Sequence, residues 1–557
     1  MALSDSGGGT PPGALPAGTP AGLPWRTSAR ALGGAGVIVA AASFSSKILG
    51  FLRDTVLARQ FGAGVSTNAY FIASQLPLVL FAAVGVAITT VFIPAFSSLL
   101  ATGGQADAEI FSARVNGFVT VAVAALVLLL EIGAPVAVSV MAPYFPLHSR
   151  ERGLAIQMVR IMAPLILFYA WSGVVGGVLN VRGFFGPNAG MGIPQNLIII
   201  AAIFVGSSRA VPDIRWVAWG SLVGTLTTYF FQLPALHRSR FRVRWRFDFA
   251  RDRRLLALAG LVGPAALTAL AQQVGIVVDR ALGSSLGPLL SDLTYANRLQ
   301  LLAYSILGLS VATVLYPTLS AAASTADMPA FRRTFARGLA LVNFVTVPVT
   351  IGMFTLREPL VRVLFQHHQF TAADTRATAV ALAFLTLGTF GYGWQDYMNR
   401  AFFALQDTRT PMLGGFIAVA VNVGLDFILV HPLRQGGLAL GTASGWTCAA
   451  AFLAVRLRRR IGLIGGRELL GRTLRMLGAA LCGLLPAVLA YGPLASAFGG
   501  VHSWLGDAAA LVAVVAGAAA IYVALCSLLR VPEAAEGLRL LRGAARRLTG
   551  AAGTGTA

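Results

Sequence analysis

Residues 33–57 read GGAGVIVAAASFSSKILGFLRDTVL, an apolar stretch long enough to cross a membrane that nevertheless carries three charged side chains. These are Lys47, Arg53 and Asp54, and Lys47 is the only lysine among the 43 lysines and arginines of the chain. Ionisable groups at membrane depth are costly, so we interpret all three as candidate functional residues. The alternative is that Arg53 and Asp54 only neutralise each other, while the ammonium group of Lys47 reaches the membrane surface.

The composition of the whole chain predicts an all-α membrane protein. Of its 557 residues, 56% are hydrophobic and 11% are charged, whereas about a quarter are charged in soluble domains. The net charge of +22 comes from arginines grouped at the ends of apolar stretches, which indicates membrane topology and no nucleic-acid partner. All three cysteines lie within apolar stretches and predict neither disulfides nor a metal site: Cys448, Cys482 and Cys526.

The spacing of the apolar stretches predicts fourteen transmembrane helices, at about 20 residues for each span. They lie near 33–58, 69–99, 113–142, 154–181, 190–207, 215–236, 255–283, 290–320, 337–356, 375–405, 411–430, 437–455, 473–493 and 507–529. An even number puts both termini on one side, and the loops of that side hold most of the arginines. Because arginine-rich loops face the cytoplasm, we predict that both termini are cytoplasmic.

Two halves of the sequence resemble each other. Gly50 and Asp54 match Gly275 and Asp279, and seven residues of the second span recur in the eighth. Each half holds six predicted spans, so the halves are parallel repeats, as in transporters that work by alternating access. The predicted organisation is a disordered cytoplasmic tail (1–30), an N-terminal lobe (31–236), a basic cytoplasmic loop (237–254), a C-terminal lobe (255–460), two further helices (461–530) and a cytoplasmic tail (531–557).

A cluster of cations is the predicted transport site. The sequence contains no nucleotide-binding loop, zinc-protease motif or CxxC pair, so we predict a transporter rather than an enzyme, with no cofactor. Lys47 and Arg53 lie in the first span, and Arg298 lies near the start of the eighth. If these spans face each other, three cations converge on one cavity, where guanidinium groups match phosphate oxygens. The alternative for Arg298 is an anchor at the membrane surface.

A second polar group combines carboxylates and amides. Asn422 and Asp426 are four residues apart and share a helical face, and Thr442 and Asp279 could complete a set of oxygen ligands. Hard cations such as Na⁺ prefer such ligands. We expect this site to lie in a different part of the molecule from the cationic cavity. The alternative is that Asp426 pairs with Arg434, and Asp279 with its neighbour Arg280.

Several motifs resemble those of a known family. They are SKILGFLRD at 46–54, FGAG at 61–64, QLP at 75–77, YANRL at 295–299 and QDTRTP at 406–411. Together they resemble the MurJ/MviN lipid II flippases, which belong to the superfamily of multidrug, oligosaccharidyl-lipid and polysaccharide exporters. The resemblance extends over all fourteen predicted spans.

The resemblance implies two six-helix lobes around a cationic cavity that receives the lipid diphosphate and its sugar. The last two spans would shape a groove for the polyprenyl tail. The substrate-binding residues it implies are Lys47, Arg53, Asp54 and Arg298. It also implies a Na⁺ site formed by Asp279, Asn422, Asp426, Thr442 and a backbone carbonyl near Leu438.

The function implied is transfer of the peptidoglycan precursor lipid II from the inner to the outer leaflet of the bacterial cytoplasmic membrane. The expected partners are this lipid-linked sugar, membrane lipids and other proteins of cell-wall synthesis. Two differences from the family pattern leave alternatives open: Asn68 stands where the family often has an aspartate, and residues 78–86 carry no charge. The alternatives are an exporter of another polyprenyl-diphosphate-linked glycan and a scaffold that transports nothing.

Overall fold

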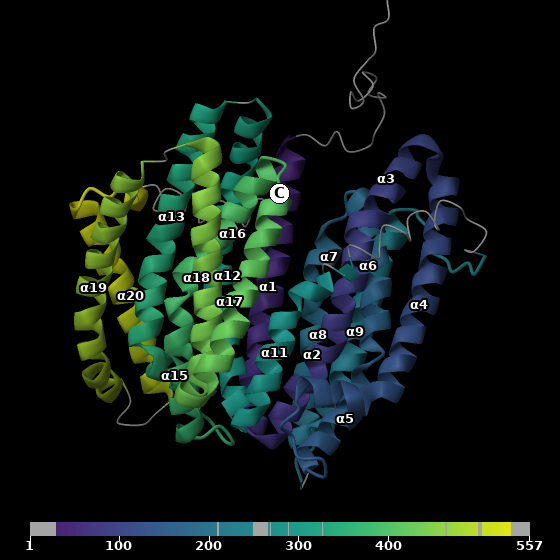
Figure 1. Cartoon of the computed structure of the whole chain (residues 1–557), viewed down its shortest axis with the longest axis horizontal. Coiled ribbons are helices and arrows are strands. Elements are labelled where there is room, and N and C mark those ends of the chain that lie inside the picture. Colours follow the sequence, from purple (N-terminus) through teal and green to yellow (C-terminus); the bar gives the residue numbers. More distant parts are fainter. Residues whose placement is uncertain are drawn as a thin grey trace, which may run out of the picture.

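The computed structural model describes residues 29–208, 211–248, 266–267, 269–287, 289–325, 327–462, 465–498 and 504–535. Over these residues the chain forms helices and no β-strand, which confirms the predicted all-α membrane fold (Figure 1). The predicted disordered tail lies outside the described residues, apart from Ala29 and Arg30.

The first half of the chain forms one group of packed helices. In it α1 packs on α7 and α8, α8 on α9, α2 on α5 and α6, and α4 on α5 and α6. The bounds are α1 (Ala29–Phe61), α2 (Val65–Val86), the π-helix η1 (Ala87–Phe92), α3 (Ile93–Thr102), α4 (Gly104–Met141), α5 (Arg150–Met162), α6 (Leu165–Val181), α7 (Gly186–Gly190), α8 (Gly192–Ser207) and α9 (Arg215–Arg238).

The second half forms a second group, with α12 at its centre. That helix packs on α13, α15 and α16, while α18 packs on α15, α16 and α17. The bounds are α11 (Val274–Gly283), η3 (Ser284–Leu286), α12 (Leu289–Ser324), α13 (Met328–Thr355), α14 (Arg357–Phe365), α15 (Ala372–Leu387), α16 (Thr389–Ala404), α17 (Arg409–Leu433) and α18 (Gln435–Ile461).

The last two helices, α19 (Gly466–Ala497) and α20 (Trp504–Leu528), pack on each other at the edge of the second group, where α19 contacts α13 (Figure 1). An ion pair fastens the segment after α20 to this edge. Arg472 Nη1 lies 2.7 Å from Oε1 of Glu533, whose side chain is 2% exposed. The first described residues of the predicted tail, 531–535, are therefore packed against the helices, and the rest of that tail lies outside the described residues.

Each of the fourteen predicted spans coincides with helix, although the seventh is described mainly over α11. Length and hydropathy alone support nine spans among the described residues, or ten if the bent pair α15–α16 counts as one. Helices α1 and α12 are not among the nine. The count of fourteen therefore stays a prediction.

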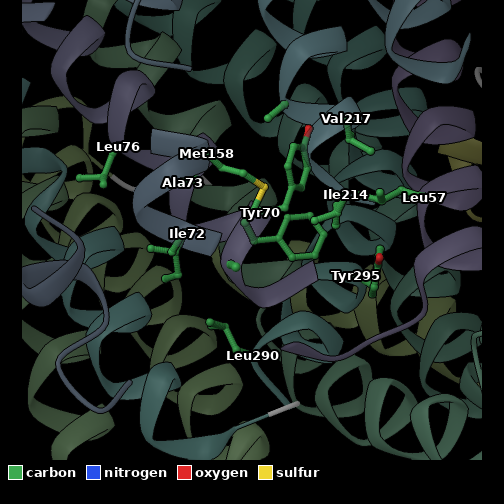
Figure 2. Packing of buried hydrophobic residues seen from close by; sticks show 14 of the residues in the cluster. Leu57, Tyr70, Ile72, Ala73, Leu76, Met158, Ile214, Val217, Leu290 and Tyr295 are labelled. Carbon is green, nitrogen blue, oxygen red and sulfur yellow. The ribbon is translucent and has the colours of Figure 1, made fainter. Parts of the chain in front are cut away.

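The two groups of helices interlock at one end of the molecule, where α1 ends and α12 begins. The side chain of Asn68 donates to the carbonyl of Gly287 at 2.8 Å and accepts from the backbone N–H of Ser291 at 3.0 Å. The fully buried Tyr295 donates its hydroxyl to the carbonyl of Gly62 at 3.2 Å. Figure 2 shows Tyr295 and Leu290 of α12 in the same apolar cluster as Tyr70 of α2. We call this the interlocked end.

A glycine with left-handed backbone allows this close approach. Gly62 has φ of +67°, and a Cβ at this position would lie 2.5 Å from the carbonyl oxygen of Gln369, which precedes α15. The backbone N–H of Gln369 in turn donates to the carbonyl of Arg59 at 3.1 Å. Any larger residue at position 62 would strain the turn and separate the two groups of helices.

The opposite end of the molecule is arginine-rich, and part of its longest loop is docked. The backbone N–H of Arg246 donates to the carbonyl of Ala113 on α4 at 3.0 Å. Arg114 Nη2 lies 3.0 Å from Oδ2 of Asp248, and the hydrogen bonds from Arg114 and Arg246 lower the pKa of this carboxyl group to about 2. Over its described part, the predicted basic loop is therefore a strap along α4. We call the end that holds this strap and the last turns of α9 and α18 the arginine-rich end.

Candidate substrate and ion sites

An aspartate holds two arginines that come from the two different groups of helices. Arg53 Nη2 lies 2.7 Å from Oδ1 of Asp54, and Arg298 Nε of α12 lies 3.6 Å from Oδ2 of the same carboxylate. Asp54 is 5% exposed, whereas the side chain of Arg298 is 45% exposed. The structure thus brings together three of the predicted substrate residues. The alternative considered above, in which Arg53 pairs with Asp54, is present as an ion pair, but Arg298 contacts the same carboxylate.

An amide that the sequence analysis did not single out orients Arg53. Oδ1 of Asn196 on α8 accepts from Arg53 Nη1 at 3.1 Å. The amide nitrogen of Asn196 donates to the carbonyl of Gly192 at 2.8 Å and to that of Ser46 at 3.3 Å. Both ends of this amide are therefore used, and Arg53 is held in one orientation between α1 and α8. A polar amide inside an apolar predicted span was the available signal.

Lys47 lies apart from this group. It precedes Arg53 by six residues on α1, which is about 9 Å along the helix towards the arginine-rich end. Its side chain is exposed and has no polar partner within the described part of the chain. The predicted convergence of three cations thus holds for Arg53 and Arg298, while Lys47 stands one to two turns nearer the arginine-rich end.

A cavity of about 200 Å³ adjoins Arg298 and supplies a different third cation, Arg280. Nη1 of Arg280 donates to the Thr294 hydroxyl at 2.5 Å instead of forming an ion pair with its neighbour Asp279. The lining residues include Gln75 of the first helix group, with Asp279, Arg280, Thr294, Asn297, Arg298, Leu301, Leu385 and Thr442 of the second. Sequence reasoning treated Arg280 only as a neutralising partner, because its convergence with Arg298 depends on how α11 packs beside α12.

The predicted cation ligands do assemble. The amide nitrogen of Asn422 donates to Asp426 Oδ2 at 2.9 Å and to the Thr442 hydroxyl at 3.3 Å. That hydroxyl donates to the carbonyl of Leu438 at 3.0 Å. The carboxyl group of Asp279 adjoins that of Asp426. In each of these two carboxyl groups, the buried Oδ1 atom has no hydrogen-bond partner.

Two adjoining buried carboxyl groups with unpartnered oxygens fit a bound cation, because a cation would satisfy both acceptors at once. The donor set, two carboxylates with a hydroxyl and carbonyl oxygen nearby, is that of a hard monovalent or divalent ion. Among the described residues no group of three or more His, Cys, Asp or Glu side chains could hold a metal. The alternative pairing of Asp426 with Arg434 is not the contact found, since Asp426 faces Asn422 and Asp279.

The expected separation of the two sites is wrong. Asp279 and Thr442 line the same cavity as Arg280 and Arg298, so the cation ligands and the cationic groups share a wall. The sequence could not show this, because Asp279 and Arg280 are adjacent residues whose side chains face different neighbours around α11. An ion at Asp279 would therefore act directly on the electrostatic potential of the cavity.

Comparison with known proteins identifies the relatives of this arrangement. The family model described as lipid II flippase MurJ matches residues 57–502. The chain belongs to the MurJ lipid II flippase family. A probable lipid II flippase MurJ of Rhizobium tropici is 27% identical over 450 residues, which cover 79% of this chain and 84% of that protein. A lipid II flippase MurJ of Burkholderia cenocepacia is 29% identical over 426 residues, which cover 74% and 81%.

Solved structures of MurJ and of related exporters share the fold. A lipid II flippase MurJ in an inward closed conformation aligns with a TM-score of 0.74 at 23% identity, over 88% of this chain and 98% of that one. An inward-facing multidrug transporter of the MATE family aligns with a TM-score of 0.63 at 17% identity, over 75% and 95%. These likenesses confirm the predicted exporter fold.

Membership of the MurJ family confirms two further predictions. Flippases are transporters, so the chain is a transporter rather than an enzyme. It is also a multi-pass bacterial membrane protein, as its apolar helices indicate. The matched range begins at Leu57, just after Arg53 and Asp54, so the roles of these two residues rest on geometry.

Proposed function

We propose that this protein transfers lipid II from the inner to the outer leaflet of the bacterial cytoplasmic membrane by alternating access. The observation that carries the proposal is the convergence of Arg53 and Arg298, from the two helix groups, on Asp54. A diphosphate that replaced the Asp54 carboxylate would bind both guanidinium groups, and so both groups of helices, at once. Family membership supplies the substrate, because relatives of this chain are named lipid II flippases.

The mechanism follows from what the diphosphate would change. In the conformation described, Asp54 neutralises Arg53 while the interlocked end holds the helix groups together. A diphosphate brings more negative charge than one carboxylate and leaves Asp54 without its partner. The loaded and unloaded proteins therefore differ in their preference between the two access states, and only such a difference can drive the switch.

The orientation we propose places the arginine-rich end in the cytoplasm. The described arginines at the ends of α9, α13 and α18 support it, since basic loops face the cytoplasm. The interlocked end then faces outward, and both termini are cytoplasmic. In this orientation the cavity near Arg298 receives the head group from the inner leaflet.

We also propose that Na⁺ binds Asp279, Asn422, Asp426, Thr442 and the carbonyl of Leu438. The two unpartnered carboxylate oxygens support this site. When bound, Na⁺ would supply positive charge beside Asp279, on the wall it shares with Arg280. These residues would hold the ion between α11, α17 and α18, and so tie the angle between these helices to ion binding.

The polyprenyl tail is proposed to lie along α19 and α20, whose outer faces are strongly apolar. Leu485 and Leu489 are 62% and 75% exposed, and Val512 is 68% exposed. Proteins of cell-wall synthesis are proposed partners, because a lipid II flippase supplies their substrate. A different polyprenyl-diphosphate-linked glycan is the second candidate substrate, favoured by the lack of charge in residues 78–86 of α2.

Replacement of the cell's own lipid II flippase tests the function. We expect a bacterium depleted of that protein to grow when this chain is supplied, and not when Arg298→Ala is supplied at equal membrane abundance. Arg215→Ala is the matched control, because Arg215 is half-exposed at the start of α9 and pairs locally with Asp213. Failure of the wild-type chain at normal abundance would move the proposal to the second substrate.

A further inference from the structure

We propose that the second helix group carries a sugar-binding wall beside the diphosphate site, made of Tyr392, Trp446, Tyr304, Asp396 and Arg400. This inference rests on the proposed function and names the part of the cavity that recognises the glycan. Sequence analysis did not single out these residues, although Asp396 and Arg400 form an ionisable pair within a predicted span.

The three aromatic rings contact one another in a row across three helices. The ring of Tyr304 on α12 lies 4.6 Å from that of Tyr392 on α16, at 78°. The ring of Tyr392 lies 4.9 Å from that of Trp446 on α18. Tyr392 and Trp446 are only partly buried, so each keeps an exposed ring surface. An exposed aromatic face can pack against the C–H face of a sugar ring.

The backbone places α16 against α18 so that these rings can meet. A bend of 45° at Gly388 separates α15 from α16. Beyond the bend, a Cβ at Gly391 would lie 2.6 Å from the hydroxyl oxygen of Thr447 on α18. Only glycine permits this approach, and it puts Tyr392 next to Trp446, one residue before Thr447.

Polar groups that suit sugar hydroxyls flank the rings. Tyr304 donates its hydroxyl to Asp396 Oδ2 at 3.1 Å, and Arg400 Nε lies 3.2 Å from the same oxygen. The side chains of Asp396 and Arg400 are 27% and 24% exposed. A partly exposed carboxylate–guanidinium pair still offers a free acceptor and free donors, which neighbouring hydroxyls of a sugar can bridge.

The wall continues the cavity that holds Arg298. Leu301, Leu385 and Thr442 line that cavity on α12, α15 and α18. Tyr304 follows Leu301 by three residues and Trp446 follows Thr442 by four, so each lies on the same face of its helix as the lining residue. Tyr392 follows Leu385 by seven residues, across the bend at Gly388. All these helices run from the interlocked end to the arginine-rich end, so the wall lies on the arginine-rich side of the cavity.

The order of these groups matches the chemistry of the substrate. Tyr304 lies six residues beyond Arg298 on α12, which is about 9 Å along the helix. In a lipid-linked glycan the first sugar is bonded directly to the diphosphate. A diphosphate held by Arg53 and Arg298 would therefore place its sugars against the wall, further towards the arginine-rich end.

Binding of two lipids to the purified full-length protein tests the wall. One is lipid II, and the other is a polyprenyl diphosphate with the same tail and no sugar. We expect Trp446→Leu and Asp396→Asn each to weaken lipid II binding at least tenfold and to change binding of the sugar-free lipid less than twofold. Arg298→Ala is expected to weaken both.

The matched control is Trp394→Leu. Trp394 lies on the same helix as Tyr392, but its indole N–H donates to Asn343 on α13 at 2.6 Å, away from the wall. Thermal unfolding of each variant, compared with Trp394→Leu, separates loss of the fold from loss of the sugar contacts. Equal effects of Trp446→Leu on both lipids, or none on either, would overturn the wall while leaving the flippase proposal intact. Wild-type protein that binds neither lipid would overturn both.

Discussion

Replacing one side chain of the interlocked end, Asn68, should change the ratio of open to closed protein by an amount that can be measured. Replacement by alanine removes three hydrogen bonds between the helix groups: one to the carbonyl of Gly287, and two from the backbone N–H and the hydroxyl of Ser291. Each is worth about 1 kcal/mol net, so Asn68→Ala costs the closed interlock about 3 kcal/mol. The ratio of open to closed protein at this end should rise about 100-fold.

Spin labels at two exposed positions can report this opening. Val65 begins α2 and Ala372 begins α15, and both are exposed near the interlocked end. The free exposed cysteines Cys448 and Cys482 must first be replaced. We expect the distance distribution between the labels to gain a long component in Asn68→Ala that is minor in the parent protein.

The control is Asn116→Ala. Asn116 is as buried as Asn68, but it donates to the carbonyl of Arg244 within the first helix group. It should leave the distances unchanged. A folded Asn68→Ala protein with the parent's distances would refute the reasoning, because the three bonds would then contribute nothing to closure.

Three further outcomes are expected. Arg298→Ala should abolish lipid II transport in vesicles without lowering the unfolding temperature, because the contact of Arg298 with Asp54 is long and half-exposed. Arg298→Lys should restore transport only partly, and normal transport by Arg298→Ala would contradict the site. Na⁺ should raise the unfolding temperature of the wild type above its value in K⁺ at equal ionic strength, and Asp426→Asn should lose this difference. If the unfolding temperature of the wild type is the same in Na⁺ and K⁺, these residues form a structural polar cluster and no ion site. Gly62→Ala should strain the turn against Gln369 and open the interlocked end, seen as faster labelling of a cysteine at Val65; labelling at the parent's rate would show that the turn adapts.

The helical fold could be predicted from the sequence because apolar stretches near membrane length leave little choice of structure. Local breaks were harder to predict. The stretch 154–181 divides into α5 and α6 beside Pro164, and 375–405 bends at Gly388, although each has the hydropathy of one span. The short helix α14 was missed, because it lies between spans and has only nine residues, three of them charged.

Prediction of the site succeeded where one helix carries the signal and failed where helices meet. Asn422 and Asp426 could be paired from their spacing alone. Asn196 and Arg280 could not be assigned, since their roles depend on contacts with α1 and α12. The distance of Lys47 from Arg298 could not be predicted either, because a rare residue type in an apolar stretch does not say which neighbour its side chain meets.

The shared ion pair of Asp54 also bears on selectivity among the anions of the cell. Asp54 acts as a tethered competitor, whose effective concentration at Arg53 is on the order of millimolar or above. Free phosphate at a similar concentration would therefore displace this carboxylate only in part. A ligand that also binds through a tail or a sugar has additional affinity with which to displace the carboxylate. At the diphosphate site proposed above, the chain's own carboxylate would thereby favour large lipid-linked substrates over small free anions.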